Sequence, residues 1–152
     1  MKVPRAFVML HLVVLGLTMA HSSKTFRAMQ LSQTKQVMQM QGGNELCKLK
    51  RKHSDENEYY LVQFDEKRKK AEESGDQGEL NKIMMEHSSK QQAMNSRQSA
   101  EEQQMMQKYK NKEVPLDMEI EMTNTQVQVL KADLDSYQKT LDNALKGSGM
   151  DS

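Results

Sequence analysis

Apolar side chains recur at alternating steps of three and four residues in the last third of the chain. We call this set the C-terminal seam: Leu116, Ile120, Val127, Leu130, Leu134, Tyr137 and Leu141. Such spacing places side chains along one face of an α-helix and is typical of a left-handed coiled coil or a helix bundle. The pattern predicts a helix whose apolar stripe is covered either by the chain's other helices or by the same stripe of another copy.

Residues that disfavour helix occur at three places, namely Gly42-Gly43, Ser74 to Gly78, and Val114-Pro115. The residue before a proline is pushed out of the α region, and glycine weakens a helix. The breaks divide the chain into four predicted helices, at 24–41, 44–73, 79–112 and 115–146. Asp76 and Glu79 can form a capping box at the start of the third helix. Strand signals are nearly absent, so we expect an all-α, elongated up-down bundle or coiled coil of about three long helices plus a short N-terminal helix.

The first twenty residues have the layout of a secretory signal peptide. Lys2 and Arg5 supply positive charge, an apolar stretch follows, and Ala20 suits cleavage after it. An uncleaved anchor is the competing interpretation, but a span needs roughly 20 mostly apolar residues and this stretch is shorter. We therefore expect a secreted, extracellular chain with no transmembrane segment in its mature form. The predicted domains are a signal peptide at 1–20, a helical arm at 21–43, a long-helix bundle at 44–146 and a flexible tail at 147–152.

The composition favours long helices over a compact globule. Without residues 1–20, about 14% of the chain is Leu, Ile, Val or Phe, whereas a globular domain has more than roughly 20%. The whole chain has 14 Met, and Met is a good helix former. Loss of Lys2 and Arg5 leaves 20 basic against 21 acidic side chains, which argues against a general nucleic-acid binder. Because so few core-forming residues must offset the entropy of ordering, we expect self-association.

Cys47 is the only cysteine, so a disulfide within one chain is excluded. An odd cysteine in a secreted protein indicates an intermolecular bridge or a free thiol. Its basic neighbours favour the thiolate. No His or acid partner accompanies it in a recognisable catalytic arrangement. Cys47 is therefore a candidate for an intermolecular disulfide, with an unpaired thiol as the alternative.

Two basic clusters flank an acidic stretch in the predicted second helix. Their members are Lys48, Lys50, Arg51, Lys52, Lys67, Arg68, Lys69 and Lys70. A run of charge is usually a solvated face. The same residues have the charge to bind a polyanion such as a sulfated glycan, and their dibasic pairs resemble processing sites of a secreted peptide precursor. These interpretations stay open at this point.

No motif indicates an enzyme, a cofactor or a metal. The sequence has no Gly-rich phosphate loop, nucleophile elbow or paired-His motif. His21, His53 and His87 lack zinc-ligand spacing, and recurrent Met pairs are more often fillers of irregular contacts than copper ligands. We expect a secreted, non-enzymatic protein that acts through coiled-coil contacts, as a homo-oligomer or with another helical protein. The alternative is an amphipathic protein that binds a lipid surface.

Overall fold

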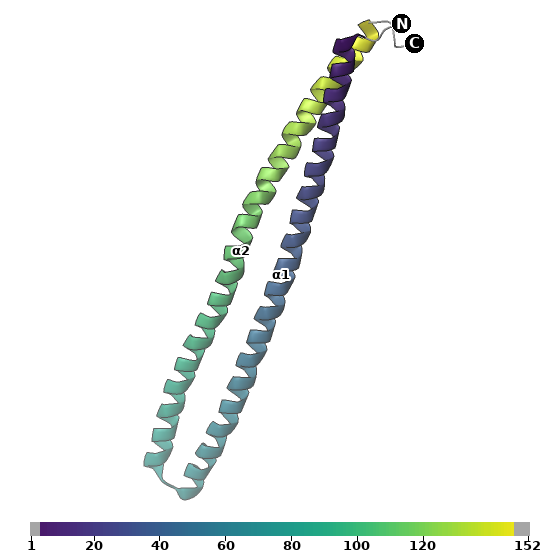
Figure 1. The fold of residues 1–152 in the computed structure, drawn as a ribbon. Coiled ribbons are helices and arrows are strands. Elements are labelled where there is room, and N and C mark those ends of the chain that lie inside the picture. Colours follow the sequence, from purple (N-terminus) through teal and green to yellow (C-terminus); the bar gives the residue numbers. More distant parts are fainter. Residues whose placement is uncertain (1–3, 148–152) are drawn as a thin grey trace. The chain divides into compact units, whose positions relative to one another are not determined.

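Two α-helices account for almost all of the described chain. The computed structural model describes residues 4–147. Within that range there is no strand, and the helices are α1 (Arg5–Ser74) and α2 (Gln77–Gly147), shown in Figure 1. The all-α prediction is confirmed, and the prediction of three long helices plus a short N-terminal helix is wrong. The predicted tail after Gly147 lies outside the described residues.

Two of the three predicted breaks do not interrupt a helix. Gly42-Gly43 lies inside α1 and Pro115 lies inside α2. A glycine in a helix costs about 1 kcal/mol and a proline about 3 kcal/mol relative to alanine. Ending a helix would instead create two new termini, each leaving four backbone groups without an intrahelical partner. Continuation at a few kcal/mol is the smaller cost, so both helices run through.

The third predicted break, at Ser74 to Gly78, is present as a short turn. Gly75 has φ +71°, a conformation that glycine adopts without the Cβ clash other residues would suffer. The amide of Gly75 donates to the carbonyl of Glu72 at 3.2 Å, and α2 begins at Gln77. The turn therefore needs only two residues outside the helices.

Asp76 caps the N-terminus of α2. Its Oδ1 accepts a hydrogen bond from the amide of Glu79 at 3.2 Å, which satisfies one of the free amides of the first turn. The capping box would also have the Glu79 side chain accept from the Asp76 amide. In the structure that amide donates to Oγ of Ser74 instead, at 3.4 Å. The predicted N-cap by Asp76 is therefore present. The amide of Asp76, however, is bound by the Ser74 hydroxyl and not by the Glu79 side chain.

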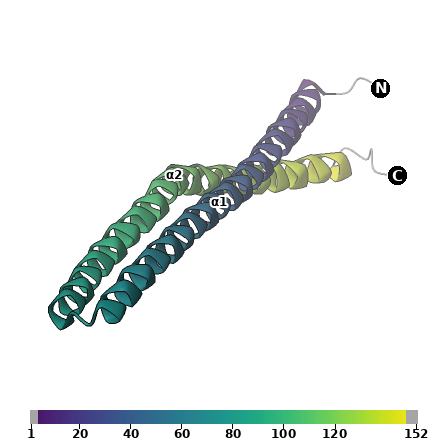
Figure 2. The ribbon, with the colours of Figure 1, turned by 90° about the horizontal axis from the view of Figure 1, so that it is seen from below.

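The described chain forms two compact units, each built from part of α1 and part of α2. The hairpin unit comprises residues 37–112, where the end of α1 and the start of α2 run side by side in opposite directions (Figures 1 and 2). The terminal unit comprises residues 1–36 and 113–152, of which residues 4–36 and 113–147 are described. Within the terminal unit, an ion pair joins Lys35 to Asp117 at 2.5 Å and another joins Arg27 to Glu119 at 2.8 Å.

The buried and half-buried side chains of both units, taken together, recur mostly at steps of three and four. The buried apolar ones are Val14, Leu31 and Leu141 in the terminal unit and Ala71 and Met94 in the hairpin unit. The buried polar ones are His53, Gln98 and Thr123. No large side chain in the described range falls below 2% exposure. In each unit, the parts of α1 and α2 thus bury one narrow stripe and leave their remaining faces in solvent.

Candidate functional site

The C-terminal seam lies on the covered face of its helix. Leu141 is buried, Tyr137 is exposed, and the other five residues are half-buried. The seam belongs to the terminal unit, together with the first part of α1. We expected cover from the segments 44–73 and 79–112 or from the same stripe of another copy; both segments belong to the hairpin unit, and cover by another copy stays a prediction. Residues 5–36 of α1 belong to the unit that contains the seam.

The thiol of Cys47 is exposed on α1. Its neighbours Leu46 and Leu49 are half-buried, so Cys47 lies beside the covered stripe and not within it. This position leaves the thiol accessible to a second molecule. An intermolecular disulfide through Cys47 stays a prediction.

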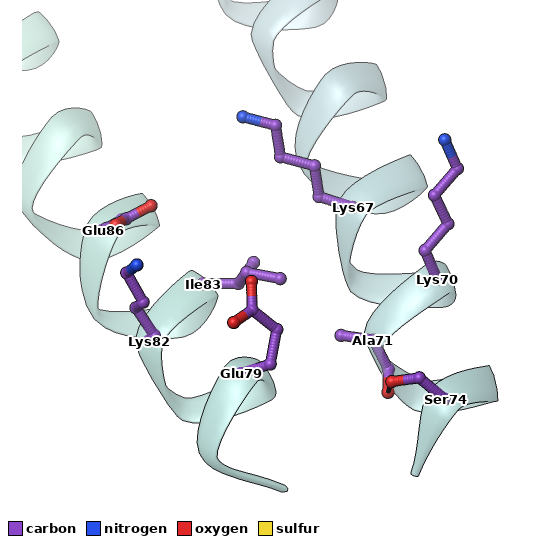
Figure 3. A pocket seen from close by; sticks show the side chains of 8 residues that line it. All are labelled: Lys67, Lys70, Ala71, Ser74, Glu79, Lys82, Ile83 and Glu86. Atoms are coloured by element: carbon purple, nitrogen blue, oxygen red, sulfur yellow. Dashed lines mark hydrogen bonds between the residues drawn. The ribbon is translucent and has the colours of Figure 1, made fainter. Parts of the chain in front are cut away.

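The two basic clusters lie on α1 within the hairpin unit, and all their members except Arg68 are exposed. Arg68 is half-buried and pairs with Asp65 at 3.6 Å. Lys67 and Lys70 line a cavity of about 410 Å³ near the turn, shown in Figure 3. The residues that line it are Lys67, Lys70, Ala71, Ser74, Glu79, Lys82, Ile83 and Glu86. Its three lysines are accompanied by two glutamates, which partly offset their charge.

A buried polar cluster joins the two helices of the hairpin unit. His53 on α1 is 3% exposed. Its Nε2 lies 2.7 Å from Oε2 of Glu101, and its Nδ1 lies 3.1 Å from Oε1 of Glu102. Both ring nitrogens therefore face carboxylates of α2. We call His53, Glu101 and Glu102 the histidine cluster.

Amide and guanidinium groups extend the histidine cluster along the helices. The side-chain amide of Gln98 donates to Oδ1 of Asn57 at 2.9 Å and to the carbonyl of His53 at 3.5 Å. Arg97 donates to Oε1 of Glu101 at 3.2 Å and also binds the carboxylate of Glu56. Buried polar groups need such partners, because leaving one unpaired costs about 1–3 kcal/mol.

The hydrogen bonds of the histidine cluster shift its titration. The bond to Glu101 raises the pKa of His53 above 6.5, with a further contribution from Glu102 and against the opposing effect of burial. The same bond lowers the pKa of Glu101 below 4.5, assisted by the charge of Arg97. Both shifts favour the charged forms, as expected of an ion pair formed between the helices.

An aromatic cluster lies nearer the turn. The ring of His87 stacks on Phe64 with centroids 3.7 Å apart, and on Tyr60 with centroids 5.4 Å apart. The ammonium of Lys90 lies 4.5 Å from the centroid of Tyr60. Two small cavities, of about 130 and 240 Å³, border His87 and Tyr60. We interpret this cluster as packing that holds the helices together near the turn.

Sequence reasoning treated His53 and His87 as isolated, because their partners are distant along the chain. Glu101 and Glu102 lie 48 and 49 positions after His53. A signal for the pairing was nevertheless present. His53 and Glu101 both fall on the three-four spacing of their helices, and a charged residue on a covered stripe needs a partner.

Two further properties bear on ligands and membranes. Residues 4–147 contain no group of three or more His, Cys, Asp or Glu side chains arranged to hold a metal ion. In the same range, one helix is long and apolar enough to cross a membrane by length and composition, α1, and its apolar window lies near the N-terminus. A signal sequence meets the same criterion.

Comparison with known proteins found no relative of this chain. No family model, curated protein or solved structure matches the chain.

Proposed function

We propose that the chain is a secreted, non-enzymatic helical protein that acts by docking its helices on other helices, and that its partner is a second copy of itself. The observation that carries the proposal is how little of the apolar surface two helices cover. Leu61, Val62, Met84 and Met85 of the hairpin unit are between 48% and 74% exposed. Large exposed apolar patches mark protein–protein contact surfaces, and packing against further helices would cover these side chains.

Secretion would strengthen the need for a partner. Cleavage after Ala20 would remove the first part of α1, including the buried Val14. The terminal unit would then keep its C-terminal seam but lose part of the segment with which it forms one compact body. A second copy carries the same C-terminal seam with the same three-four spacing. Pairing of helices from two copies would therefore cover the seam.

Light scattering on residues 21–152, with and without reductant, tests the proposal. We expect a mass above that of one chain under both conditions, with a further covalent dimer through Cys47 only without reductant. Leu61→Gln combined with Val62→Gln should lower the mass while helicity by circular dichroism is unchanged. Lys69→Gln, also an exposed α1 position, is the matched control. A single-chain mass in every condition contradicts the proposal.

Binding of a polyanion is the second candidate. Seven exposed basic side chains on one helix of the hairpin unit favour it. Affinity chromatography on a sulfated glycan at low salt tests it, because such binding weakens steeply as salt rises. Neutralising Lys50, Arg51 and Lys52 should lower the salt concentration that elutes the protein. Elution in the void volume at low salt would exclude this candidate.

A further inference from the structure

The closed arrangement of the histidine cluster requires two protons on one ring. A neutral imidazole has one N–H, whereas an imidazolium has two. In the structure both ring nitrogens of His53 lie within 3.1 Å of carboxylate oxygens, which are acceptors only when ionised. If His53 were neutral, one of its lone pairs would face a carboxylate directly. The observed geometry is therefore specific to the charged ring.

Of the two carboxylates beside the ring, Glu102 depends more on the positive charge of His53. Within the described chain its only hydrogen-bond or ion-pair partner is His53. Glu101 is held by Arg97 as well, at 3.2 Å, and Arg97 also binds Glu56. The charged groups around the ring are thus Glu101, Glu102 and Arg97 from α2 and Glu56 from α1. Loss of the charge on His53 would leave three carboxylates with one guanidinium among them.

We propose that His53 is a proton-operated latch of the hairpin unit. With its proton, the ring bridges Glu101 and Glu102 and holds α2 against α1. Without it, the facing lone pair and the two carboxylates repel, and the helices separate locally at this level. A more acidic solution closes the latch, and a more alkaline one opens it.

Local opening at this level is inexpensive compared with the rest of the hairpin unit. The buried residues here are His53 and Gln98, both polar, and the flanking Glu101 and Glu102 are only half-buried. Few apolar contacts are lost when the helices part at this point, and such regions open at low free energy. Nearer the turn, the stacked rings of Phe64 and His87 hold the helices independently of the latch.

The direction of the pH effect follows from the two shifts. The pKa of His53 is raised in the folded chain, so its contribution to stability is complete below about 6.5 and is lost as pH rises through the raised value. The pKa of Glu101 is lowered, so its contribution is present above about 4.5 and is lost as pH falls through the lowered value. The latch is therefore most stable between these limits.

Two measurements on the isotopically labelled 152-residue chain test the latch. The first is the titration of the His53 Cε1–H resonance, assigned by its loss in His53→Gln, with an expected midpoint above 6.5. The second is amide exchange at residues 98–105, corrected for the intrinsic pH dependence. Protection should fall about tenfold, the scale of one charged hydrogen bond, as pH rises through that midpoint.

Variants separate the latch from a merely structural role. His53→Gln should remove the pH dependence of protection, and His87→Gln should retain it. Glu102→Gln keeps the ring and should lower the His53 midpoint towards 6.5, so it serves as the test if His53→Gln does not fold. A midpoint at or below 6.5, protection independent of pH, or a pH effect that persists in His53→Gln would overturn the proposal.

Discussion

Gly42 lies so close to the ring of Tyr109 that a Cβ on the glycine would come within 2.9 Å of the Cγ and Cδ1 atoms of the ring. The glycine that sequence reasoning interpreted as a helix break is thus a site of close packing between α1 and α2. Its neighbour Gly43 has nothing within 4 Å of the same position. There is therefore room for a Cβ at Gly43 but not at Gly42, unless the Tyr109 ring moves.

Alanine at these two positions should change stability in opposite directions. Gly43→Ala should raise the free energy of unfolding by about 0.5–1 kcal/mol, because alanine forms helix better than glycine and meets no neighbour. Gly42→Ala gains the same propensity but must displace the Tyr109 ring, and overpacking typically costs about 1–3 kcal/mol. We expect a net loss, measured by urea denaturation. Equal stabilisation by both substitutions would show that the ring moves freely.

Pro115→Ala should stabilise α2. The proline lies inside the helix, so it lacks an amide to donate to the carbonyl of Asn111. Alanine restores the donor, and the free energy of unfolding should rise by up to about 3 kcal/mol. Val114→Ala, at a half-exposed neighbouring position, keeps the proline and is the control. If the urea midpoint of Pro115→Ala equals that of the original chain, the helix is not continuous there in solution.

Leu31 should be among the most sensitive apolar positions. Its side chain is 3% exposed in the terminal unit, and Leu31→Ala should cost about 2–3 kcal/mol through lost burial and the cavity left behind. Met29 lies on the same helix but is 52% exposed, so Met29→Ala should change stability by less than about 0.5 kcal/mol. Thermal or urea unfolding of the pair measures the difference. Equal effects would contradict the observed burial pattern.

The hydroxyl of Tyr109 should control the titration of Glu45. Their hydrogen bond lowers the pKa of Glu45 below 4.5 and raises the pKa of Tyr109 above 10.0. Tyr109→Phe keeps the ring on Gly42 but removes the donor, so the Glu45 carboxyl should titrate nearer its ordinary value. Carboxyl NMR measures this change. Tyr59→Phe, at an exposed position, should leave the Glu45 titration unchanged.

The direction of the stability change caused by Tyr109→Phe follows from the lowered pKa of Glu45. A lowered carboxyl pKa stabilises the fold above the unfolded value and loses this effect as pH falls through the folded value. Tyr109→Phe should therefore be less stable than the original chain at pH 7. The difference should disappear on acidification below the Glu45 pKa. A difference that is constant with pH would mean that the hydroxyl acts through packing alone.

Local sequence signals predicted the helices but not their number. The three-four spacing of the C-terminal seam and the Asp76 cap both have counterparts in the structure. Gly42 and Pro115 were predicted to end helices, but their helix-breaking tendency is a local cost of only a few kcal/mol. Whether that cost ends a helix depends on what packs opposite, here the Tyr109 ring for Gly42. The partner lies far along the chain, so no local pattern reports it.

The same limit applies to the histidine cluster. The sequence showed His53 on a covered stripe, and only the pairing of α1 with α2 places Glu101 and Glu102 beside it. For the C-terminal seam, one predicted cover, the segments 44–73 and 79–112, lies in the other unit, and cover by another copy stays a prediction. In each case a pairing of distant segments decided the result, and spacing along the chain does not specify it.

Only Gly75 and Asp76 separate α1 from α2. One additional residue that extends the first turn of α2, and does not merely lengthen the loop, would rotate the rest of α2 by about 100° about its own axis, because a helix completes a turn every 3.6 residues. The carboxylates of Glu101 and Glu102 would then point away from His53, more than twenty positions from the insertion. The phase in which the two helices meet across the hairpin unit therefore depends on the number of helical residues between this turn and the histidine cluster.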